Sequence, residues 1–437
     1  MKKQSVLQTG ITVGSHIHYH QCRFCHNSPL IPFIDFGYVP LAGGFFPKSV
    51  ANKDFINEQL YPLQICVCPT CYLVQCNTIV SRDALFHSYY YFSSVIPTLI
   101  NHFTTFAEEL RRSVVKPSKT FIVELGCNDG VFLTPLRALG FKTLGVDPAT
   151  NVVKPLIRKG FNIINDYFSE CVAENVTKTY GQADIIVSSN SFAHIDDMDD
   201  IMRGIKRLLK KNGVFIFETH YLGDLLKHFQ YDMMYHEHHS YYSLTSLEPY
   251  VRSFDLEIVD VKRIPIHAGS MRYYVRHIAH ASKVNASVKA LKKEEKQKGM
   301  DTIHAYFQFY KTIDKRRRDL QNLIAKIKSS GKTIAGYGAS GRATIMMSFC
   351  SITKNDIPYV IDDAPAKIGA FTPGNHLPIT SSSILYKPKR PDYVILFAWS
   401  FADDIIKQHT NYLASGGKFI IPLPHVSIVD KSYGSSQ

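Results

Sequence analysis

Residues 124–130 read Glu-Leu-Gly-Cys-Asn-Asp-Gly and overlap the end of an apolar run, Phe121–Leu125. Apolar runs of this length favour a buried strand, and glycines after a strand let the backbone turn and approach a ligand closely. The two glycines, Gly126 and Gly130, are four positions apart. We therefore predict a strand that runs into a ligand-binding loop and then a helix, as in doubly wound α/β folds.

The composition of this loop restricts its ligand. It lacks the three-glycine dinucleotide fingerprint, and Glu124 would repel a pyrophosphate group. A carboxylate suits a ligand that carries a sulfonium and an amino acid group. The loop therefore favours S-adenosylmethionine over NAD as cofactor.

Further cofactor residues are expected at the ends of the following strands. Asp147 ends the predicted strand Thr143–Val146, where a carboxylate can accept hydrogen bonds from both ribose hydroxyls. Phe168 either packs against adenine or belongs to the core. The strand Ala183–Ser188 brings Ser189, Asn190 and His194 to the same edge of the sheet. The predicted cofactor-binding residues are Glu124, Gly126, Asn128, Asp129, Gly130, Asp147, Phe168 and Asn190.

Strands and helices alternate along most of the chain, which predicts an α/β fold with a doubly wound sheet. The alternation that begins near Thr120 includes the strand Val214–Glu218, and a second alternation begins with Thr333–Tyr337. We therefore expect a separate α/β domain at the carboxy terminus.

Four of the nine cysteines have the spacing of a metal site. Cys22 and Cys25 are separated by two residues, as are Cys68 and Cys71. Two such pairs supply the four thiolates of a closed tetrahedral zinc site, which leaves no position for water. We predict one structural Zn²⁺ that folds the amino-terminal segment, with reduced buried thiols as the alternative.

A dense cluster of titratable groups follows the strand Val214–Glu218. Residues 235–242 read Tyr-His-Glu-His-His-Ser-Tyr-Tyr, and we expect a catalytic base there. The His-x-His spacing also suits a metal, and histidines that are satisfied in the core are a third interpretation. Further on, His267 and Arg272 lie on a predicted turn before the strand Tyr273–His277, where arginine is suited to binding phosphate.

Length and composition exclude several classes of protein. The 437 residues, of which 45% are hydrophobic and 20% charged, indicate two or three globular domains. No stretch reaches the roughly 18 apolar residues that span a bilayer, and Met1 to Gly14 lacks an apolar signal core, so we expect a cytoplasmic location. Residues 281–330 hold thirteen Lys/Arg and five Asp/Glu and carry most of the net charge of +13. This segment is either a helical pair with a solvated face or a surface for polyanions.

Taken in order, these motifs resemble those of the bacterial S-adenosylmethionine-dependent C-methyltransferases that act on nucleotide-diphosphate keto-deoxysugars. The resemblance extends over nearly the whole chain. Besides the paired cysteines, it includes Tyr89-x-Tyr91-x-Ser93-Ser94, Gly126-x-Asn128-Asp129-Gly130, Ala193-His194, Tyr235-His236-Glu237-His238 and Gly336-Tyr337-Gly338-Ala339.

The resemblance implies a domain organisation and a reaction. The expected parts are a zinc-binding module (15–80), a class I Rossmann-like methyltransferase domain with a preceding helical linker (81–280), a basic helical linker (281–328) and a Rossmann-like nucleotide-sugar-binding domain (329–430). The implied reaction transfers a methyl group to a carbon, C3, next to the C4 ketone of a nucleotide-diphosphate 4-keto-6-deoxysugar, through an enolate.

The resemblance also implies roles for individual residues. His238 is the expected base, and Glu237 is its orienting group or an auxiliary acid or base. The polar groups expected around the enolate and ketone are Tyr89, His194 and Tyr235. The expected substrate-binding residues are Tyr91, His267, Arg272 and Arg342.

Other functions stay open from the sequence alone. O- or N-methylation of another small molecule would need no base for a carbon acid. A zinc-containing nucleic-acid-binding protein would use the basic segment, but aromatic residues do not interleave with its lysines and arginines as stacking requires, so we expect no nucleic-acid partner. Gly336–Gly341 matches Gly-x-Gly-x-x-Gly, which alone is a weak indication of an oxidoreductase module. We expect no membrane partner and a monomer or homodimer.

Overall fold

The strand and loop at residues 121–130 lie in the middle of a seven-stranded sheet, called the central sheet here. In the computed structural model, which describes residues 11–13, 16–50, 52–81, 92–281 and 283–432, its strands follow the order β13 (Leu256–Ile264), β14 (Ser270–His277), β11 (Leu209–His220), β10 (Ala183–Ser189), β7 (Phe121–Leu125), β8 (Lys142–Val146) and β9 (Ile163–Ile164). All neighbouring pairs are parallel except the two that β14 makes. The predicted doubly wound α/β sheet is therefore confirmed.

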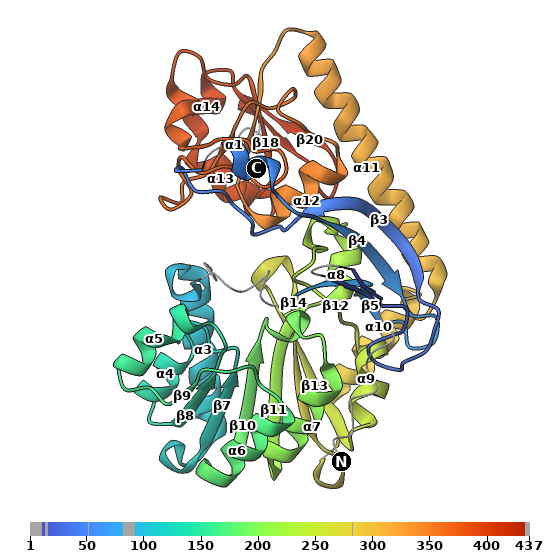
Figure 1. Cartoon of the computed structure of the whole chain (residues 1–437), viewed down its shortest axis with the longest axis vertical. Helices are drawn as coiled ribbons and strands as arrows, with labels where there is room; N and C mark the ends of the chain where they lie inside the picture. Colours follow the sequence, from blue (N-terminus) through green and yellow to red (C-terminus); the bar gives the residue numbers. More distant parts are fainter. Residues whose placement is uncertain (1–10, 14–15, 51, 82–91, 282, 433–437) are drawn as a thin grey trace.

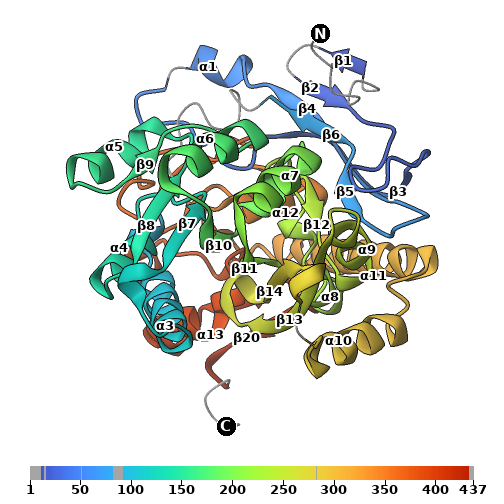
Figure 2. The same cartoon turned by 90° about the horizontal axis from the view of Figure 1, so that it is seen from below.

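Helices flank the central sheet (Figures 1 and 2). They are α3 (Pro97–Ser113), α4 (Leu133–Ala138), α5 (Thr150–Arg158), α6 (Glu170–Tyr180), α7 (Met198–Leu208) and α9 (Leu244–Arg252). Helix α8 (Leu222–Lys227) lies instead beside β4 and β12, with Leu222 and Leu225 buried in the same core as Ile34 (Figure 1). Helix α3 shows why such a segment docks, since Leu99, Phe103 and Phe106 recur at helical spacing and are buried. The ring of Phe106 stacks on that of Phe132, with centroids 4.8 Å apart.

A second sheet, the carboxy-terminal sheet, lies at the opposite end of the long axis of the molecule (Figure 1). Its order is β17 (Ile379–Thr380), β16 (Val360–Ile361), β15 (Ile334–Tyr337), β18 (Tyr393–Leu396), β19 (Lys418–Ile421) and β20 (Ser427–Val429). Only β20 is antiparallel to its neighbour. The helices of this part are α12 (Gly341–Phe349), α13 (Ala402–Gln408) and α14 (Thr410–Ala414).

The amino-terminal module consists of β1 to β6 and α1. Its strands β3, β4 and β5 lie between the two sheets, whereas α1 lies beside the carboxy-terminal sheet, where Phe55 contacts Phe371 (Figure 1). Its elements are β1 (Ile11–Val13), β2 (His16–His18), β3 (Ile31–Pro40), α1 (Asn52–Ile56), β4 (Leu60–Val67), β5 (Val74–Cys76) and β6 (Thr78–Val80). Strands β3, β4 and β5 continue into β12 (Ser240–Tyr241), which belongs to the segment between α8 and α9. The sequence did not predict this pairing, because it joins residues far apart in the chain.

The basic segment forms two helices, α10 (Ala286–Gln297) and α11 (Ile303–Ser329). Figure 1 shows α11 running along one side of the molecule to the carboxy-terminal sheet. One face of α11 is buried through residues such as Tyr306 and Ile313, whereas basic side chains such as Arg318 are exposed and pair with acids on the same helix. The helical pair with a solvated face is therefore confirmed. Within the described part of the chain, no helix combines the length and the apolar character that crossing a membrane requires.

Candidate active site

A cavity of about 410 Å³ opens at the carboxyl ends of the central strands. Its walls come from α3, from the ends of β7, β8, β10 and β11 and the loops near them, from residues 233–238, from His267 and from Arg342 of α12. This size is within the usual range for small-molecule sites. Ligands of doubly wound sheets bind at this edge, so the position agrees with the sequence-based expectation.

One half of the cavity contains the glycine loop. Gly126 has a φ of +74°, which side chains other than glycine rarely adopt, and a Cβ there would lie 2.7 Å from the Cβ of Ser191. The backbone N–H of Asn128 donates to Oδ2 of Asp147 over 2.9 Å and so fixes the loop against the end of β8. Phe168 and Asn190 line the same half.

The other half contains His238, whose two ring nitrogens have different partners. Nδ1 lies 2.9 Å from the carbonyl oxygen of Met233, and Nε2 lies 3.1 Å from the hydroxyl of Tyr235. A carbonyl oxygen only accepts hydrogen bonds, so Nδ1 carries the proton and Nε2 is the basic atom. Burial and the neighbouring His194 lower the pKa of His238 to about 3, so the ring is neutral in the free protein.

Three more histidines surround His238. The ring centroids of His194 and His220 lie 5.1 and 5.0 Å from that of His238, and His267 lies 5.4 Å from His220. Burial lowers the pKa of His194 and of His267 to about 4. The cluster is therefore a group of neutral imidazoles that can donate or accept hydrogen bonds without adding charge.

Glu237 lies between this cluster and the amino-terminal module. Burial raises the pKa of Glu237 to about 7, and no cation pairs with its carboxyl group among the described residues. The loop after β3 passes close to it, since a Cβ on Gly43 would lie 3.2 Å from Oε1 of Glu237. A carboxyl group that titrates near neutrality beside a histidine is suited to acid–base chemistry.

Arg342 enters the cavity from the first turn of α12 in a fixed orientation. Its Nε donates to Oδ2 of Asp232 over 2.8 Å, and its Nη1 donates to Oγ of Ser400 over 3.2 Å. The guanidinium carbon lies 4.8 Å from the ring centroid of Trp399, whose Nε1 donates to the same Asp232 oxygen over 2.8 Å. Nη2 of Arg342 is buried without a hydrogen-bond partner among the described residues, so it is available to an anion in the cavity.

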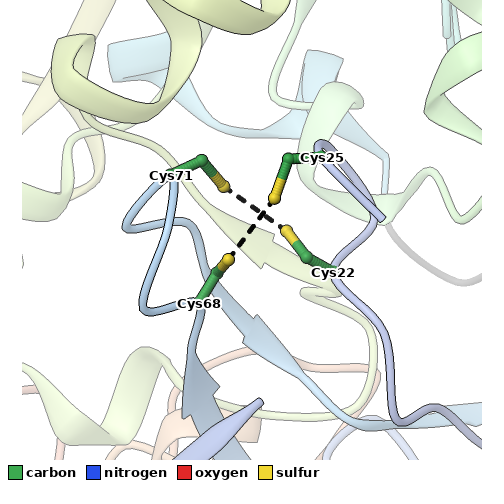
Figure 3. Close-up of side chains that lie close together, drawn as sticks. All are labelled: Cys22, Cys25, Cys68 and Cys71. Atoms are coloured by element: carbon green, nitrogen blue, oxygen red, sulfur yellow. Dashed lines mark hydrogen bonds between the residues drawn. The ribbon is translucent and has the colours of Figure 1, made fainter. Parts of the chain in front are cut away.

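The four cysteines of the two Cys-x2-Cys pairs meet at one point outside this cavity, as Figure 3 shows. Their sulfur atoms all lie within 4.8 Å of one another, with Cys22 to Cys71 at 3.4 Å and Cys25 to Cys68 at 3.5 Å. Ligands at Zn–S distances of about 2.3 Å in a tetrahedron would be about 3.8 Å apart, so the cluster fits this ion. It is the one group in the described part of the chain with metal-binding geometry, so the metal interpretation of His236 and His238 gains no support.

Comparison with known proteins identifies the family. A methyltransferase domain model matches residues 100–261, a C-methyltransferase C-terminal domain model matches residues 265–424, and a zinc binding domain model matches residues 22–86. C-methyltransferase NovU of Streptomyces niveus is 31% identical over 414 residues, which make up 94% of this chain and 96% of NovU. The chain belongs to the S-adenosylmethionine-dependent C-methyltransferase family.

More distant matches cover only part of this C-methyltransferase. The ubiquinone biosynthesis O-methyltransferase of Pelagibacter ubique is 26% identical over 111 residues, which are 25% of this chain and 45% of that protein. A solved S-adenosylmethionine-dependent methyltransferase from Anabaena variabilis is 16% identical, covers 40% of this chain and 83% of its own, and superposes with a TM-score of 0.31. The PH0226 protein from Pyrococcus horikoshii is 15% identical, with 43% and 95% covered and a TM-score of 0.34.

The cofactor half of this C-methyltransferase fits S-adenosylmethionine. Oε2 of Glu124 is buried beneath the loop without a hydrogen-bond partner among the described residues, and the nearby Asp147 carboxylate faces the cavity from the end of β8. Burial, followed by the charges of Asp147 and Asp129, raises the pKa of Glu124. A bound cation nearby would relieve this unfavourable concentration of carboxylates. The predicted cofactor and the predicted structural zinc are therefore both confirmed for the family and consistent with the residues present.

Three of the predicted cofactor residues, Glu124, Asp129 and Gly130, do not line the cavity. The Asp129 carboxylate accepts the backbone N–H of Ser94 over 3.0 Å, and the Asn128 side chain accepts that of Ser93 over 3.1 Å, although Asn128 also lines the cavity. A Cβ on Gly130 would lie 2.7 Å from a methyl group of Leu156, so this glycine allows α5 to pack. The loop thus serves helix packing and the attachment of residues 93 and 94 as well as ligand approach.

The prediction for Arg272 is wrong in its local structure. This residue lies inside β14, paired with Glu218, and not on a turn before the strand. Its guanidinium group is buried, where Nε donates to Glu218 over 2.6 Å, Nη1 donates to Glu109 over 2.7 Å, and the group stacks over the ring of Phe106. Arg272 therefore lies in the interior of the fold and is not a candidate phosphate ligand.

The remaining predicted residues divide into two groups. The cavity brings together His194, Tyr235, Glu237, His238, His267 and Arg342. Tyr89 and Tyr91 lie outside the described residues. Sequence reasoning missed His220, although it lies only two residues after the predicted strand Val214–Glu218. It also missed Asp232, because a buried aspartate has no local pattern.

Proposed function

We propose that this C-methyltransferase methylates C3 of a nucleotide-diphosphate 4-keto-6-deoxysugar through an enolate, with His238 as the base. The observation that carries the proposal is a single cavity that joins the cofactor loop, the neutral His238 and the cationic Arg342. These three features match the three parts of such a reaction, namely methyl donor, carbon acid and diphosphate anchor.

His238 is suited to remove a proton next to a ketone. Its Nδ1 donates to Met233, which leaves the Nε2 lone pair directed toward Tyr235 and the cavity. When substrate binds, the Tyr235 hydroxyl can transfer its hydrogen bond from His238 to the oxygen of the ketone, where negative charge develops. This exchange frees the base and stabilises the enolate in one movement.

Protonation would turn His238 into a buried cation, which needs compensation. Glu237 lines the same cavity, and as a carboxylate it would stabilise the imidazolium. S-adenosylmethionine, when bound, supplies the electrophilic methyl group. The apolar side chains of Leu99, Phe103 and Phe168 line the cavity and would limit the access of water that could reprotonate the enolate.

Arg342 is the proposed anchor of the diphosphate. Its guanidinium group is held by Asp232 and Trp399 before any ligand binds, and its free Nη2 can donate to a phosphate oxygen. The dinucleotide-like loop Gly336–Gly341, which precedes Arg342, uses its backbone groups for contacts within the protein. The N–H of Ala339 donates to Asp362 over 2.9 Å, and Nζ of Lys367 donates to the Ala339 carbonyl over 2.6 Å. These contacts favour a nucleotide-sugar-binding site over a second, redox-active site.

We also place the reaction in the cytoplasm. All nine cysteines are in the described residues and none forms a disulfide, which agrees with a reducing compartment. The enzyme would act there on a small-molecule substrate as a monomer or homodimer.

The test is product analysis with a panel of nucleotide-diphosphate 4-keto-6-deoxysugars. We expect a mass gain of about 14 Da, one methyl group in place of one hydrogen, and a new carbon–carbon bond at C3 in the NMR spectrum of the product. A methyl group on oxygen or nitrogen would instead establish the O- or N-methyltransferase alternative, which needs no carbon-acid base.

A further inference from the structure

The amino-terminal module contacts the backbone of the proposed base directly. The thiol of Cys76 lies 3.2 Å from the carbonyl oxygen of His238, and the N–H of Cys76 donates to the carbonyl oxygen of His239 over 3.0 Å. In addition, Gln75 of β5 pairs with Ser240 of β12. The module therefore supports the segment that carries His238 from behind.

Arg23 extends this contact to the cysteine cluster. It lies between Cys22 and Cys25 in the sequence and is 5% exposed. Its Nη1 donates to the side-chain oxygen of Gln75 over 3.1 Å, to the carbonyl of Cys76 over 2.8 Å and to the carbonyl of His239 over 3.2 Å. The Nη1 atom of Arg23 thus connects the segment Cys22–Cys25 to both sides of the β5–β12 pair.

The charge of Arg23 has no carboxylate partner within the described part of the chain. Its Nε and Nη2 are buried there without hydrogen bonds, and no carboxylate lies within ion-pair distance. A buried guanidinium group is costly unless an anion compensates it. A Zn²⁺ ion with four thiolates has a net charge of −2 and would supply that anion one residue away.

Gln75 connects the two charges. Its Nε2 donates to Sγ of Cys22 over 3.3 Å while its Oε1 accepts from Arg23. Such contacts beyond the metal ligands commonly orient the groups around a metal centre. A chain of hydrogen bonds therefore connects the cysteine thiolates, through the side chains of Gln75 and Arg23, to the backbone at residues 238 and 239.

We propose that Arg23 is a positioning residue for His238, and that the charge of the zinc centre holds Arg23 in place. The statement rests on the proposed function in one respect, since the role of His238 as base comes from there. The same contact reaches His194, because the N–H of His239 donates to the carbonyl of Ala193 over 2.7 Å.

The test compares variants of the full-length, zinc-loaded protein. Arg23→Met removes the charge and the donors at similar length, and Arg23→Lys keeps the charge with a single nitrogen. His26→Gln is the matched control, because His26 directly follows Cys25 but pairs with Asp199 over 3.1 Å, away from His238. Each variant is measured for zinc per chain, for S-adenosylmethionine affinity, for kcat and KM of the sugar substrate, and for the imidazole ¹⁵N signals of His238, assigned with His238→Asn.

For Arg23→Met we expect bound zinc and unchanged cofactor affinity, shifted His238 signals and a kcat lowered about 10- to 100-fold, the usual effect of losing an outer contact of a metal site. Arg23→Lys should recover part of both the kcat and the signal positions, and His26→Gln should match the wild type. Folded, zinc-bound Arg23→Met protein with wild-type kcat and wild-type His238 signals would overturn the proposal.

Two further outcomes are decisive. If Arg23→Met does not fold, Gln75→Met carries the test, because it removes only the link between Cys22 and Arg23; unfolding of both variants would make these residues purely structural and overturn the positioning role. If the wild type methylates none of the keto-sugars, the proposed function fails, while the His238 signals still report whether Arg23 positions the ring.

Discussion

Nδ1 of His238 lies 2.9 Å from the carbonyl oxygen of Met233, which fixes the tautomer of the proposed base. Because the carbonyl must accept, the lone pair of the imidazole is on Nε2, next to the hydroxyl of Tyr235. The backbone thus presents a neutral, oriented ring to the cavity.

Replacing the base should stop the chemical step without affecting binding. His238→Asn keeps a polar side chain but has no basic nitrogen, so we expect kcat to fall about 10²- to 10⁴-fold, the usual contribution of a general base. Zinc content and S-adenosylmethionine affinity should match the wild type. Keto-sugar methylation at the wild-type rate would exclude His238 as the base.

Tyr235→Phe tests the proposed hydrogen-bond exchange. The variant keeps the ring but loses the hydroxyl that bonds Nε2 of His238 over 3.1 Å. We expect a kcat lower by about 10²-fold, because one donor to the developing enolate oxygen is lost, with a smaller change in KM for the sugar. A change confined to KM would show that the hydroxyl only binds the substrate.

The pH dependence should report Glu237. Because burial raises its pKa to about 7, this carboxyl group is protonated below that pH and ionised above it. Only the ionised form stabilises the imidazolium, so kcat/KM should rise as the pH increases through about 7. His238 and His194, whose pKa values are about 3 and 4, remain neutral across this pH range, so their titration adds no second transition to the pH profile of kcat/KM. The rise should disappear in Glu237→Gln, and its persistence there would assign it to another group.

Asp232→Asn should weaken binding of the sugar nucleotide. The substitution removes the charge that holds Nε of Arg342 and Nε1 of Trp399. Loss of one charge-assisted hydrogen bond is worth about 1.5 kcal/mol, so we expect the KM for the nucleotide sugar to rise about tenfold. The affinity for S-adenosylmethionine, measured by calorimetry, serves as the internal control and should not change.

Removal of the zinc should unfold the amino-terminal module. Cys68→Ser removes one of the four thiolates, and sites of this kind couple metal binding to folding. We expect zinc bound per chain to fall well below one and the thermal unfolding temperature to decrease. Cys171→Ser is the matched control, since Cys171 is exposed and is not in the cluster. Equal zinc content and equal melting of the two variants would contradict the assignment.

Local patterns predicted the elements that depend on neighbours in sequence. The strand at Phe121–Leu125 could be predicted from its apolar composition, and the metal site from the spacing of the two cysteine pairs. The structure contains both. Long-range pairing could not be predicted in this way. Strand β12 is only two residues long and owes its existence to β5, far away in the chain.

Site residues were predictable where a motif carries the chemistry and not where burial decides the role. His238 and Arg342, both singled out from motifs, line the cavity. Arg272 failed because β14 begins at Ser270, earlier than predicted, which turns a presumed loop residue into a strand residue facing Glu218 and Glu109. Asp232 was missed because its importance comes from Arg342 and Trp399, which the chain brings to it only after folding.

The most direct measurement is exchange of the C3 hydrogen of a nucleotide-diphosphate 4-keto-6-deoxysugar in deuterated water, with S-adenosylhomocysteine in the cofactor site so that no methyl group is available. Proton NMR should show that the wild type replaces this one hydrogen by deuterium and that His238→Asn does so at least about 10²-fold more slowly. Equal exchange by both proteins, or methylation of the sugar without any enzyme-dependent exchange, would contradict an enolate formed by His238.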